Sequence, residues 1–398
     1  MAVEVVAMNC YVAFVKRKVY AVIGVLLLSL TNLFAQPFTI DPQLFDQRGA
    51  DDALGLFYPK DMETVTIYKP TAETDRFSNG AVMVAFKGKL YCQWQSSAQD
   101  EDSPDTWVAY SSSTDVYNWS EPMPLANASD TAYCTSGGWW VNGDTLIAFV
   151  NVWPLNLHPR GGYTCYTQSV DGTNWTTLQP VIQVDGTPLC GVMEQDPKSL
   201  ADGRIVSAVH LQPGLLVNPI YTDHHNGYTG WKIAKYSNYA IHNAVSQEIE
   251  PSWFQQKDGT LVMVFRDQGS SFKKIAATSV DKGQTWSYPV LTDMPDSRSK
   301  QSAGNLPDGT AYMVSNPVGT KSRFPLVITL AETGKHFDRA FVLRGGKGLQ
   351  EKRYEGKAKT IGYSYPKSFV WEGYLYVSYA VNKEDIQFSR VPLYSLKL

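Results

Sequence analysis

The sequence has little of what marks several common protein classes. Its 398 residues include five cysteines, and no CxxC or CxxH spacing indicates a metal site. The formal net charge is -3, which gives no reason to expect nucleic acid or an anionic membrane as a partner. Strong helical periodicity is hard to find, whereas aromatic residues make up 13% of the chain. We therefore expect no cofactor and no bound metal, and an all-β fold.

The chain also lacks an apolar run long enough to span a membrane comfortably. Residues 19–30 are apolar but few, and they follow the basic residues 16–18. Ala35 is a suitable last residue before a cleavage site. This pattern predicts a signal peptide over residues 1–35, with an uncleaved anchor as the alternative. We expect an exported protein, periplasmic, at the cell surface or secreted, without stable membrane insertion once the signal is removed.

Four cysteines remain after that segment: Cys92, Cys134, Cys165 and Cys190. In an exported chain, four thiols could form two disulfides. Cys92 and Cys165 lie inside strand-like runs, where cysteine also serves as a small buried apolar group. The sequence leaves both interpretations open.

What the chain has in quantity is one repeated pattern: an apolar run, a turn with glycine and a second apolar run. The clearest copy is residues 250–286, where Asp258 and Gly259 separate two short apolar runs and strongly indicate a hairpin. Equivalent turns fall at residues 87–89, 143–144, 201–203, 257–259, 307–309 and 371–373. One such small sheet cannot bury both of its faces, so six copies predict sheets stacked around an axis. We therefore expect a six-bladed β-propeller over residues 75–398, after an irregular N-terminal segment 36–74.

Several repeats end in a Ser-x-Asp…Trp motif that we interpret as a folding element. Aspartate and serine satisfy the backbone of a tight turn, and tryptophan packs between strands. Residues 279–286 carry the full SxDxGxTW pattern, and residues 113–119 and 169–175 are one residue shorter. These motifs resemble the Asp-box, or BNR repeat, of the sialidase (neuraminidase) superfamily. The resemblance implies the six-bladed sialidase-like propeller.

The same resemblance implies a set of active-site residues. Sialidases carry three arginines that bind a substrate carboxylate, together with a Tyr/Glu pair and an aspartate. Glu250 and Arg266 flank the fourth turn at the family's spacing (266 − 250 = 16). Arg323 precedes an apolar run in the fifth unit, and Tyr363 stands in a Tyr-Ser pair that resembles the one holding the nucleophile. Arg76 takes the first arginine position, although the family's Ile-Pro does not follow it.

An acidic window before the first Asp-box resembles the place of the family's general acid. It holds Asp100, Glu101 and Asp102, of which we favour Asp102. The chemistry suits these residue types, because an arginine fork matches a carboxylate. A neutral tyrosine avoids the repulsion that an anionic nucleophile would meet at a carboxylate-bearing anomeric carbon. The aspartate would protonate the leaving oxygen and then activate water.

The positions of Glu250 and Arg266 have counterparts in the other units when the turns are aligned. These counterparts are mostly polar: Asn79 and Gln95, Thr135 and Asn151, and Glu194 and His210. A ring of polar residues predicts a pocket on the propeller axis, and we expect Glu194 and His210 to bind substrate there.

We expect an exo-acting glycoside hydrolase that removes a terminal acidic sugar, such as sialic acid, from a glycan, and that works as a monomer. One alternative is a related propeller that acts on rhamnose- or uronide-containing glycans as a glycosidase or a polysaccharide lyase. Such enzymes also bind a carboxylate but work with His/Tyr/Arg sets, often by β-elimination. Another alternative is a glycan-binding propeller without catalysis, in which Glu250 and Arg266 are a structural pair and Tyr363 a packing residue.

Overall fold

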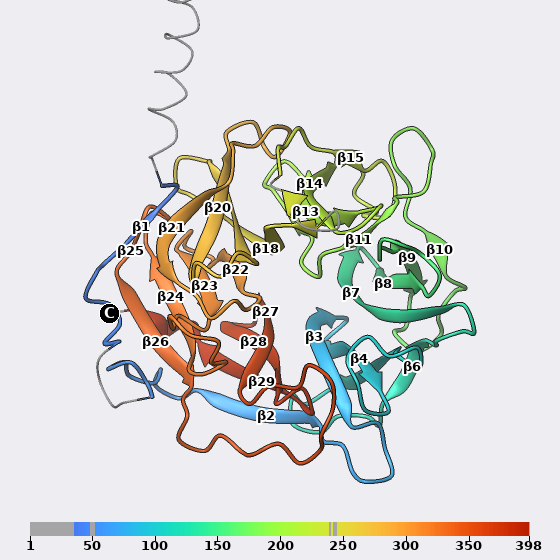
Figure 1. The fold of residues 1–398 in the computed structure, drawn as a ribbon, viewed down its shortest axis with the longest axis horizontal. Coiled ribbons are helices and arrows are strands. Elements are labelled where there is room, and N and C mark those ends of the chain that lie inside the picture. Colours follow the sequence, from blue (N-terminus) through green and yellow to red (C-terminus); the bar gives the residue numbers. More distant parts are fainter. Residues whose placement is uncertain (1–35, 48–51, 239, 242–244, 398) are drawn as a thin grey trace, which may run out of the picture. The chain divides into compact units, whose positions relative to one another are not determined.

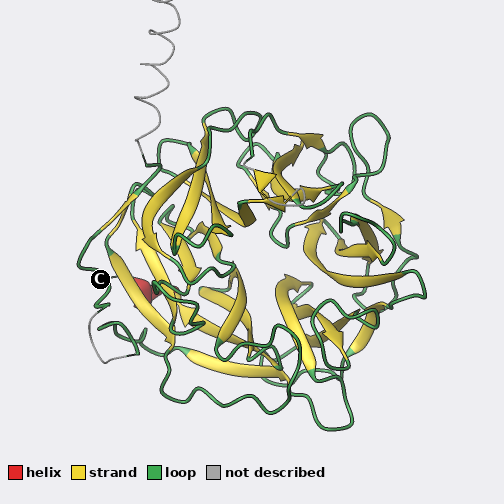
Figure 2. Ribbon diagram, viewed as in Figure 1, coloured by secondary structure: helices red, strands yellow, loops and turns green. Residues whose placement is uncertain are grey.

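β-Strands dominate the structure. The computed structural model describes residues 36–47, 52–238, 240–241 and 245–397, so the predicted signal peptide lies outside the described residues. The chain divides into two units, Met1–Pro37 and Phe38–Leu398, and the strands of the described residues lie in the second unit. In the described residues the helical content is one 3-10 turn, Leu393–Leu396, among many strands (Figure 2).

Six sheets are arranged around a common axis, which confirms the predicted six-bladed β-propeller (Figure 1). Within each of the first five sheets the strands follow one another in chain order, apart from a few short extra strands. The inner strands, which lie nearest the axis, are β3 (Phe77–Phe86), β7 (Ala132–Asn142), β11 (Gly191–Met193), β18 (Glu248–Gln255), β22 (Ser302–Asn305) and β27 (Tyr363–Trp371).

The remaining strands complete the blades from the inside outward. Blades 1 to 3 add β4 (Lys89–Ser97), β5 (Trp107–Ser113) and β6 (Met123–Ala126); β8 (Thr145–Pro154), β9 (Tyr163–Ser169) and β10 (Gln179–Pro180); and β13 (Ile205–Leu211), β14 (Leu216–Thr222) and β15 (Lys232–Ile233), with β12 (Lys198–Ser199) also paired to β13. Blades 4 to 6 add β19 (Leu261–Asp267), β20 (Lys273–Ser279) and β21 (Val290–Pro295); β23 (Ala311–Ser315), β24 (Leu326–Ala331) and β26 (Arg339–Arg344); and β28 (Tyr374–Val381), β29 (Asp385–Pro392) and β2 (Glu63–Tyr68).

The N-terminal segment closes the ring. β2 pairs antiparallel with β29, so the outermost strand of the last blade comes from the start of the propeller chain (Figure 1). This pairing covers a sheet edge that would otherwise be exposed. The propeller therefore begins before residue 75, and residues 36–74 are not the irregular segment that we expected.

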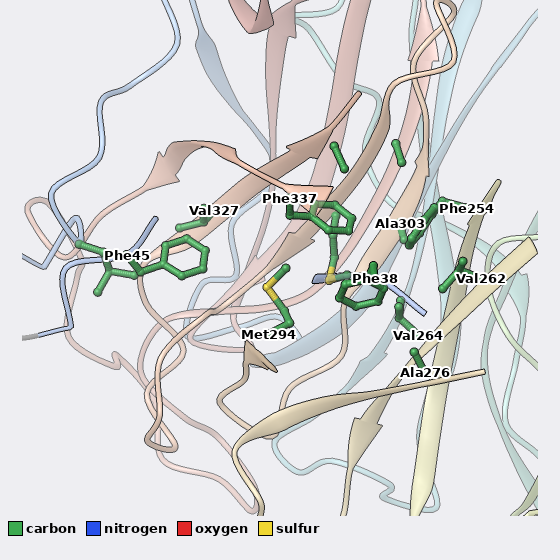
Figure 3. Close-up of a cluster of buried hydrophobic side chains, with 14 residues drawn as sticks. Phe38, Phe45, Phe254, Val262, Val264, Ala276, Met294, Ala303, Val327 and Phe337 are labelled. Atoms are coloured by element: carbon green, nitrogen blue, oxygen red, sulfur yellow. The ribbon is translucent and has the colours of Figure 1, made fainter. Parts of the chain in front are cut away.

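The same segment also covers the apolar seam between blades 4 and 5. Its strand β1 (Thr39–Ile40) pairs with β25 (His336–Phe337). The ring of Phe38 lies 5.2 Å from that of Phe337 and 6.1 Å from that of Phe254, within a cluster of buried side chains (Figure 3). Burying one phenylalanine contributes roughly 1.5–3 kcal/mol. The segment is thus bound to the propeller by side-chain packing as well as by strand pairing.

The Asp-box geometry matches the folding role predicted for it. The Asp281 carboxylate accepts hydrogen bonds from the backbone N–H groups of Gln284 and Thr285, at 3.1 and 2.9 Å. The hydroxyl of Ser279 donates to Asp281 at 2.8 Å, and the indole N–H of Trp286 donates to the Gly283 carbonyl at 3.0 Å. The hydrogen bonds of Asp281 and Ser279 therefore close the motif's own loop, which is a folding role.

The cysteines that could have paired are free thiols. Cys92, Cys134 and Cys165 are buried, and Cys190 is exposed. Across the part of the chain that the structure describes, there is no grouping of three His, Cys, Asp or Glu side chains suited to a metal ion. In that same part, no helix has the length and apolar character needed to cross a bilayer.

Two minor strands complete the described secondary structure. They are β16 (Ala240–Ile241) and β17 (Val245–Ser246), which pair with each other in the chain leading into blade 4. Val245 lines a cavity on the propeller axis, so this short hairpin contributes to the wall of that cavity.

Candidate active site

A cavity of about 220 Å³ lies where the inner strands converge. All six blades contribute to its lining, through Gly80 and Gln95, Thr135 and Asn151, Glu194 and His210, Glu250, Lys300, and Tyr365. In blades 1 to 4 these residues include most of the ring positions aligned from the sequence. The polar ring therefore does surround a pocket.

Four inner strands share one irregularity, a β-bulge beside the cavity. The residues with positive φ at these bulges are Gly80 (66°), Gly138 (93°), Glu250 (54°) and Tyr365 (57°). Glycine adopts this conformation freely, but a residue with a side chain is strained there by about 1–2 kcal/mol. Bulges redirect side chains, and strained non-glycine residues cluster at functional sites. Among these four bulges, Glu250 and Tyr365 are thus the two non-glycine residues that the fold holds in a strained conformation.

Glu250 and Tyr365 both line the cavity and lie near the same guanidinium group. Arg266 Nη1 donates to Glu250 Oε2 at 3.0 Å. Burial alone would raise the pKa of Glu250, but the positive charges of Arg266 and Lys300, with the neighbouring Tyr365, hold that pKa well below its usual range. Glu250 is therefore an ionised carboxylate beside the tyrosine.

Tyr365 is the neutral partner of this pair. Burial raises its pKa well above the usual range, and the carboxylates of Glu250 and Glu101 add to this effect. Arg266 and Arg323 act in the opposite direction and favour the phenolate. The arrangement is a phenol beside a carboxylate base and two guanidinium groups, which suits the activation of a tyrosine nucleophile.

Each of the two arginines has a hydrogen-bond donor without an acceptor among the described residues. Arg323 is 9% exposed, and its Nη2 donates to the Arg298 carbonyl at 3.4 Å. Among the described residues, neither Arg323 Nη1 nor Arg266 Nε has an acceptor. Burial, together with the charge of Arg266, lowers the pKa of Arg323. Buried cationic groups with unused donors favour an anionic ligand.

Two lysines lie near the Tyr365 ring. The ammonium nitrogens of Lys300 and Lys383 lie 5.4 and 5.5 Å from its centre. Lys300 also pairs with Glu194 at 2.8 Å, and Lys383 with Glu101 at 2.7 Å. Positive charge around Tyr365 therefore comes from these lysines as well as from Arg266 and Arg323. Of these four groups only Lys300 lines the cavity itself, where Glu101 and Glu194 also lie.

His210 holds the bulge of Glu250 rather than facing the cavity with a free nitrogen. The backbone N–H of Glu250 donates to His210 Nε2 at 3.3 Å, and Nδ1 lies 3.4 Å from Glu194 Oε1. Burial lowers the pKa of His210, although the two carboxylates act against this. The ring is thus neutral, with its proton on Nδ1 toward Glu194, and both nitrogens are engaged.

Of the three acidic residues in the predicted acid window, two line the cavity. Glu101 pairs with Lys383, while Asp102, in the left-handed region at φ 58°, pairs with Arg160 at 2.7 Å. Asp100 instead accepts from the backbone N–H of Lys357 at 2.7 Å. Asp102 therefore reaches the cavity from the loop between β4 and β5.

With this geometry in place, comparison with known proteins gives the family. The model of the BNR repeat-like domain matches residues 88–377. The chain belongs to the BNR repeat-like domain family. This confirms the predicted resemblance to sialidase-type, Asp-box propellers. No curated protein sequence matches the chain.

Solved structures with similar folds include several sialidases. A protein described as a sialidase is 18% identical, with a TM-score of 0.58 over 90% of this chain, which spans 35% of that longer chain. The intramolecular trans-sialidase from Ruminococcus gnavus is 13% identical, with a TM-score of 0.63 over 88% of this chain and 100% of its own. Trypanosoma rangeli sialidase in complex with sialic acid is 14% identical, with a TM-score of 0.55 over 88% of this chain and 60% of its own. At these identities the likeness establishes the fold.

Two residues predicted for the site lie elsewhere in this BNR repeat-like propeller. Tyr363 is 1% exposed, and its hydroxyl donates to the Gly345 carbonyl at 3.0 Å while Arg344 lies over its ring. Arg76 donates to the Ala72 carbonyl at 3.1 Å and does not line the axial cavity. The bulge after Ser364 explains the first difference, because it turns Tyr365 instead of Tyr363 toward the axis.

The structure adds site residues that sequence reasoning missed. They are Tyr365, Lys300 and Lys383. For Tyr365 the sequence does offer a pointer, because it stands two residues after the predicted nucleophile. No motif marks the two lysines, which lie in connecting segments near the axis.

Proposed function

We propose that this protein is an exo-acting glycoside hydrolase that removes a terminal acidic sugar from a glycan. One observation carries the proposal: Tyr365 and Glu250 line the same cavity at two strained bulges, and Arg266 pairs with Glu250 there. A carboxylate on the sugar would find the unused guanidinium donors of Arg266 and Arg323. A neutral tyrosine is the nucleophile suited to an anomeric carbon that carries such a carboxylate.

In the proposed reaction, the Tyr365 oxygen attacks the anomeric carbon and its proton passes to Glu250. The bond from that carbon to the leaving oxygen breaks, and the leaving oxygen takes a proton from Asp102. A water molecule, deprotonated by Asp102, then attacks the glycosyl–tyrosine bond. The free sugar leaves, and Tyr365 recovers its proton from Glu250, so that the site returns to its initial state.

The test is hydrolysis of fluorogenic aryl glycosides by the purified protein. We expect release from an acidic sugar, with the sialoside and the glucuronide as the two first substrates, and none from the neutral galactoside. Tyr365→Phe should lower kcat/KM by about a thousandfold or more, since it removes the nucleophile. Tyr363→Phe is the matched control, because it removes the hydroxyl of a tyrosine two residues away that serves packing.

Three results would contradict the proposal. Equal loss of activity in the two tyrosine variants would mean that folding, and not Tyr365 chemistry, is being measured. An unsaturated product would assign the site to a lyase. Binding of acidic sugars without turnover would make the protein a glycan-binding propeller.

We also propose that the protein is exported, acts as a monomer and is not inserted in a membrane after processing. The basic and apolar pattern of residues 16–30 supports export and processing. Mass spectrometry of the protein from the host's culture fractions should find a mature N-terminus at Gln36. Recovery of the intact N-terminus would contradict cleavage at this position.

A further inference from the structure

One wall of the axial cavity presents a guanidinium group stacked on aromatic rings. Arg160, in the loop between β8 and β9, holds its guanidinium carbon 4.4 Å from the centre of the Trp153 ring. Trp153 in turn stacks on Tyr133 with ring centres 6.0 Å apart and planes at 5°. Arg160 Nη2 donates to the Tyr133 hydroxyl at 2.6 Å and lies 2.7 Å from Asp102 Oδ1. The flat face that this wall offers is therefore the guanidinium and not the indole.

The loop that carries Arg160 is held in place by close packing. A Cβ added at Gly162 would lie 2.5 Å from the Val152 carbonyl oxygen and 2.7 Å from Val192 Cγ1, so no larger residue fits there. The indole N–H of Trp153 donates to Thr135 Oγ1 at 2.9 Å, which fixes the ring under the guanidinium. Arg160 is thus built into the wall, not a mobile surface arginine.

The tip of Arg160 nevertheless remains available to a ligand. Its side chain is 47% exposed and that of Asp102 is 34% exposed. The contacts of its guanidinium run through Nε and Nη2, and Nη1 has no acceptor among the described residues. Exposed ion pairs contribute little, about 0–1 kcal/mol, so a ligand anion can replace Asp102 on Arg160 at small cost.

The Asp102–Arg160 pair conflicts with the role proposed for Asp102. A general acid must donate a proton to the leaving oxygen, but in this arrangement Asp102 Oδ1 faces a guanidinium. An arginine fork binds sulfate, phosphate and carboxylate groups in the same planar geometry that it uses for aspartate. A leaving group that brings such an anion would occupy Arg160 and free Asp102 for proton transfer.

We propose that Arg160, stacked on Trp153 and Tyr133, forms a leaving-group subsite for a sugar that carries an anionic substituent. The substituent is a sulfate ester, a phosphate ester or a carboxylate. The substrate of this propeller is then a glycan with acidic groups on both sides of the bond that is cleaved. This inference rests on the proposed hydrolase function, and it names the sugar on the other side of the scissile bond.

Binding of single sugars tests the subsite without any turnover. Isothermal titration of galactose 6-sulfate, galactose 6-phosphate, galacturonic acid and galactose against the purified protein should show at least one acidic sugar bound about tenfold more tightly than galactose. The acidic sugar with the largest gain identifies the anion. Arg160→Met should remove this preference. Arg204→Met is the matched control, since Arg204 also lies over a tyrosine ring, at 4.6 Å, and pairs with an aspartate, at 2.7 Å, but does not line the axial cavity.

Turnover provides the second measurement. A substrate whose leaving sugar carries the preferred anion should be cleaved with a kcat/KM about tenfold above its neutral counterpart by the wild type, and equally by Arg160→Met. Absence of any cleavage would refute the hydrolase proposal, whereas the titrations would still decide the subsite. Equal binding of all four sugars by the wild type, or an acidic preference that survives in a folded Arg160→Met protein, would overturn the inference.

Discussion

Lys274 offers a sharp test of how the fold supports the site. Its ammonium group is fully buried and pairs with the equally buried Asp296 at 2.8 Å. It also donates to the Ser299 carbonyl at 2.8 Å and to Gln301 Oε1 at 2.7 Å. Gln301 in turn donates to the backbone carbonyl of Glu250 at 2.8 Å. Lys274 therefore joins the loop before blade 5 to the bulge that carries the proposed base.

Replacing Lys274 by methionine should lower the free energy of unfolding by about 3–5 kcal/mol. Methionine keeps the apolar stem of the side chain but leaves the Asp296 carboxylate buried without its cation, which is the costly way to break an ion pair. The neighbouring residue supplies the control. Lys273 pairs with Asp293 at 3.2 Å, but both side chains are about half exposed, so Lys273→Met should cost at most about 1 kcal/mol.

Urea unfolding followed by tryptophan fluorescence measures both variants. A double variant removes the unpaired Asp296 charge as well. Lys274→Met combined with Asp296→Asn should lose less stability than the sum of the losses of the two single variants. A cost for Lys274→Met within about 1 kcal/mol of that for Lys273→Met would refute the reasoning. Strictly additive single changes would show that the two groups do not act as a pair.

Two further perturbations test the residues around Glu250 and Arg323. Since the folded-state pKa of His210 is lowered from an ordinary value of about 6.5, the unfolded chain binds more protons below that pH, and stability should fall as pH drops from about 6.5. His210→Gln should flatten this part of the unfolding curve measured between pH 7 and 5; an unchanged slope would contradict the assignment. Gly362→Ala should weaken binding of acidic sugars in titrations, because its Cβ would lie 2.6 Å from Arg323 Cβ and displace that arginine. Gly373→Ala, also at positive φ but with no atom within 4 Å of the added Cβ, should bind as the wild type does; equal effects of both changes would reject a specific role for Gly362.

The sequence predicts the blades well, because each blade is a local hairpin pattern. Glycine turns and alternating apolar runs are read over short stretches, and the Asp-box adds a motif whose hydrogen bonds are internal to the loop. The alignment of repeats also places Glu194 and His210 at the cavity together with Glu250. These residues could be predicted because equivalent positions in a propeller face the same axis.

The features that the sequence does not predict are those that differ from one repeat to the next, such as a long-range strand pairing, a β-bulge or the orientation of a side chain. β2 has an alternating strand pattern too short to be distinguished from a loop, and its partner β29 lies at the other end of the chain. Tyr363 and Tyr365 would point to the same side of a regular strand, so that only the bulge after Ser364 separates them. Arg76 has the right position along the chain, but its guanidinium turns to the Ala72 carbonyl.

The missing third arginine does not leave the cavity short of positive charge. Lys300 and Lys383 both lie near the ring of the proposed nucleophile, and each already has a carboxylate partner in Glu194 or Glu101. An acidic sugar entering this cavity must therefore compete with the carboxylates of the protein itself, including Glu250 on Arg266. Such competition selects for ligands with more than one anionic group, because each added group can replace one internal carboxylate. The ion pairs around Tyr365 and the Asp102–Arg160 pair therefore both favour a substrate with more than one anionic group.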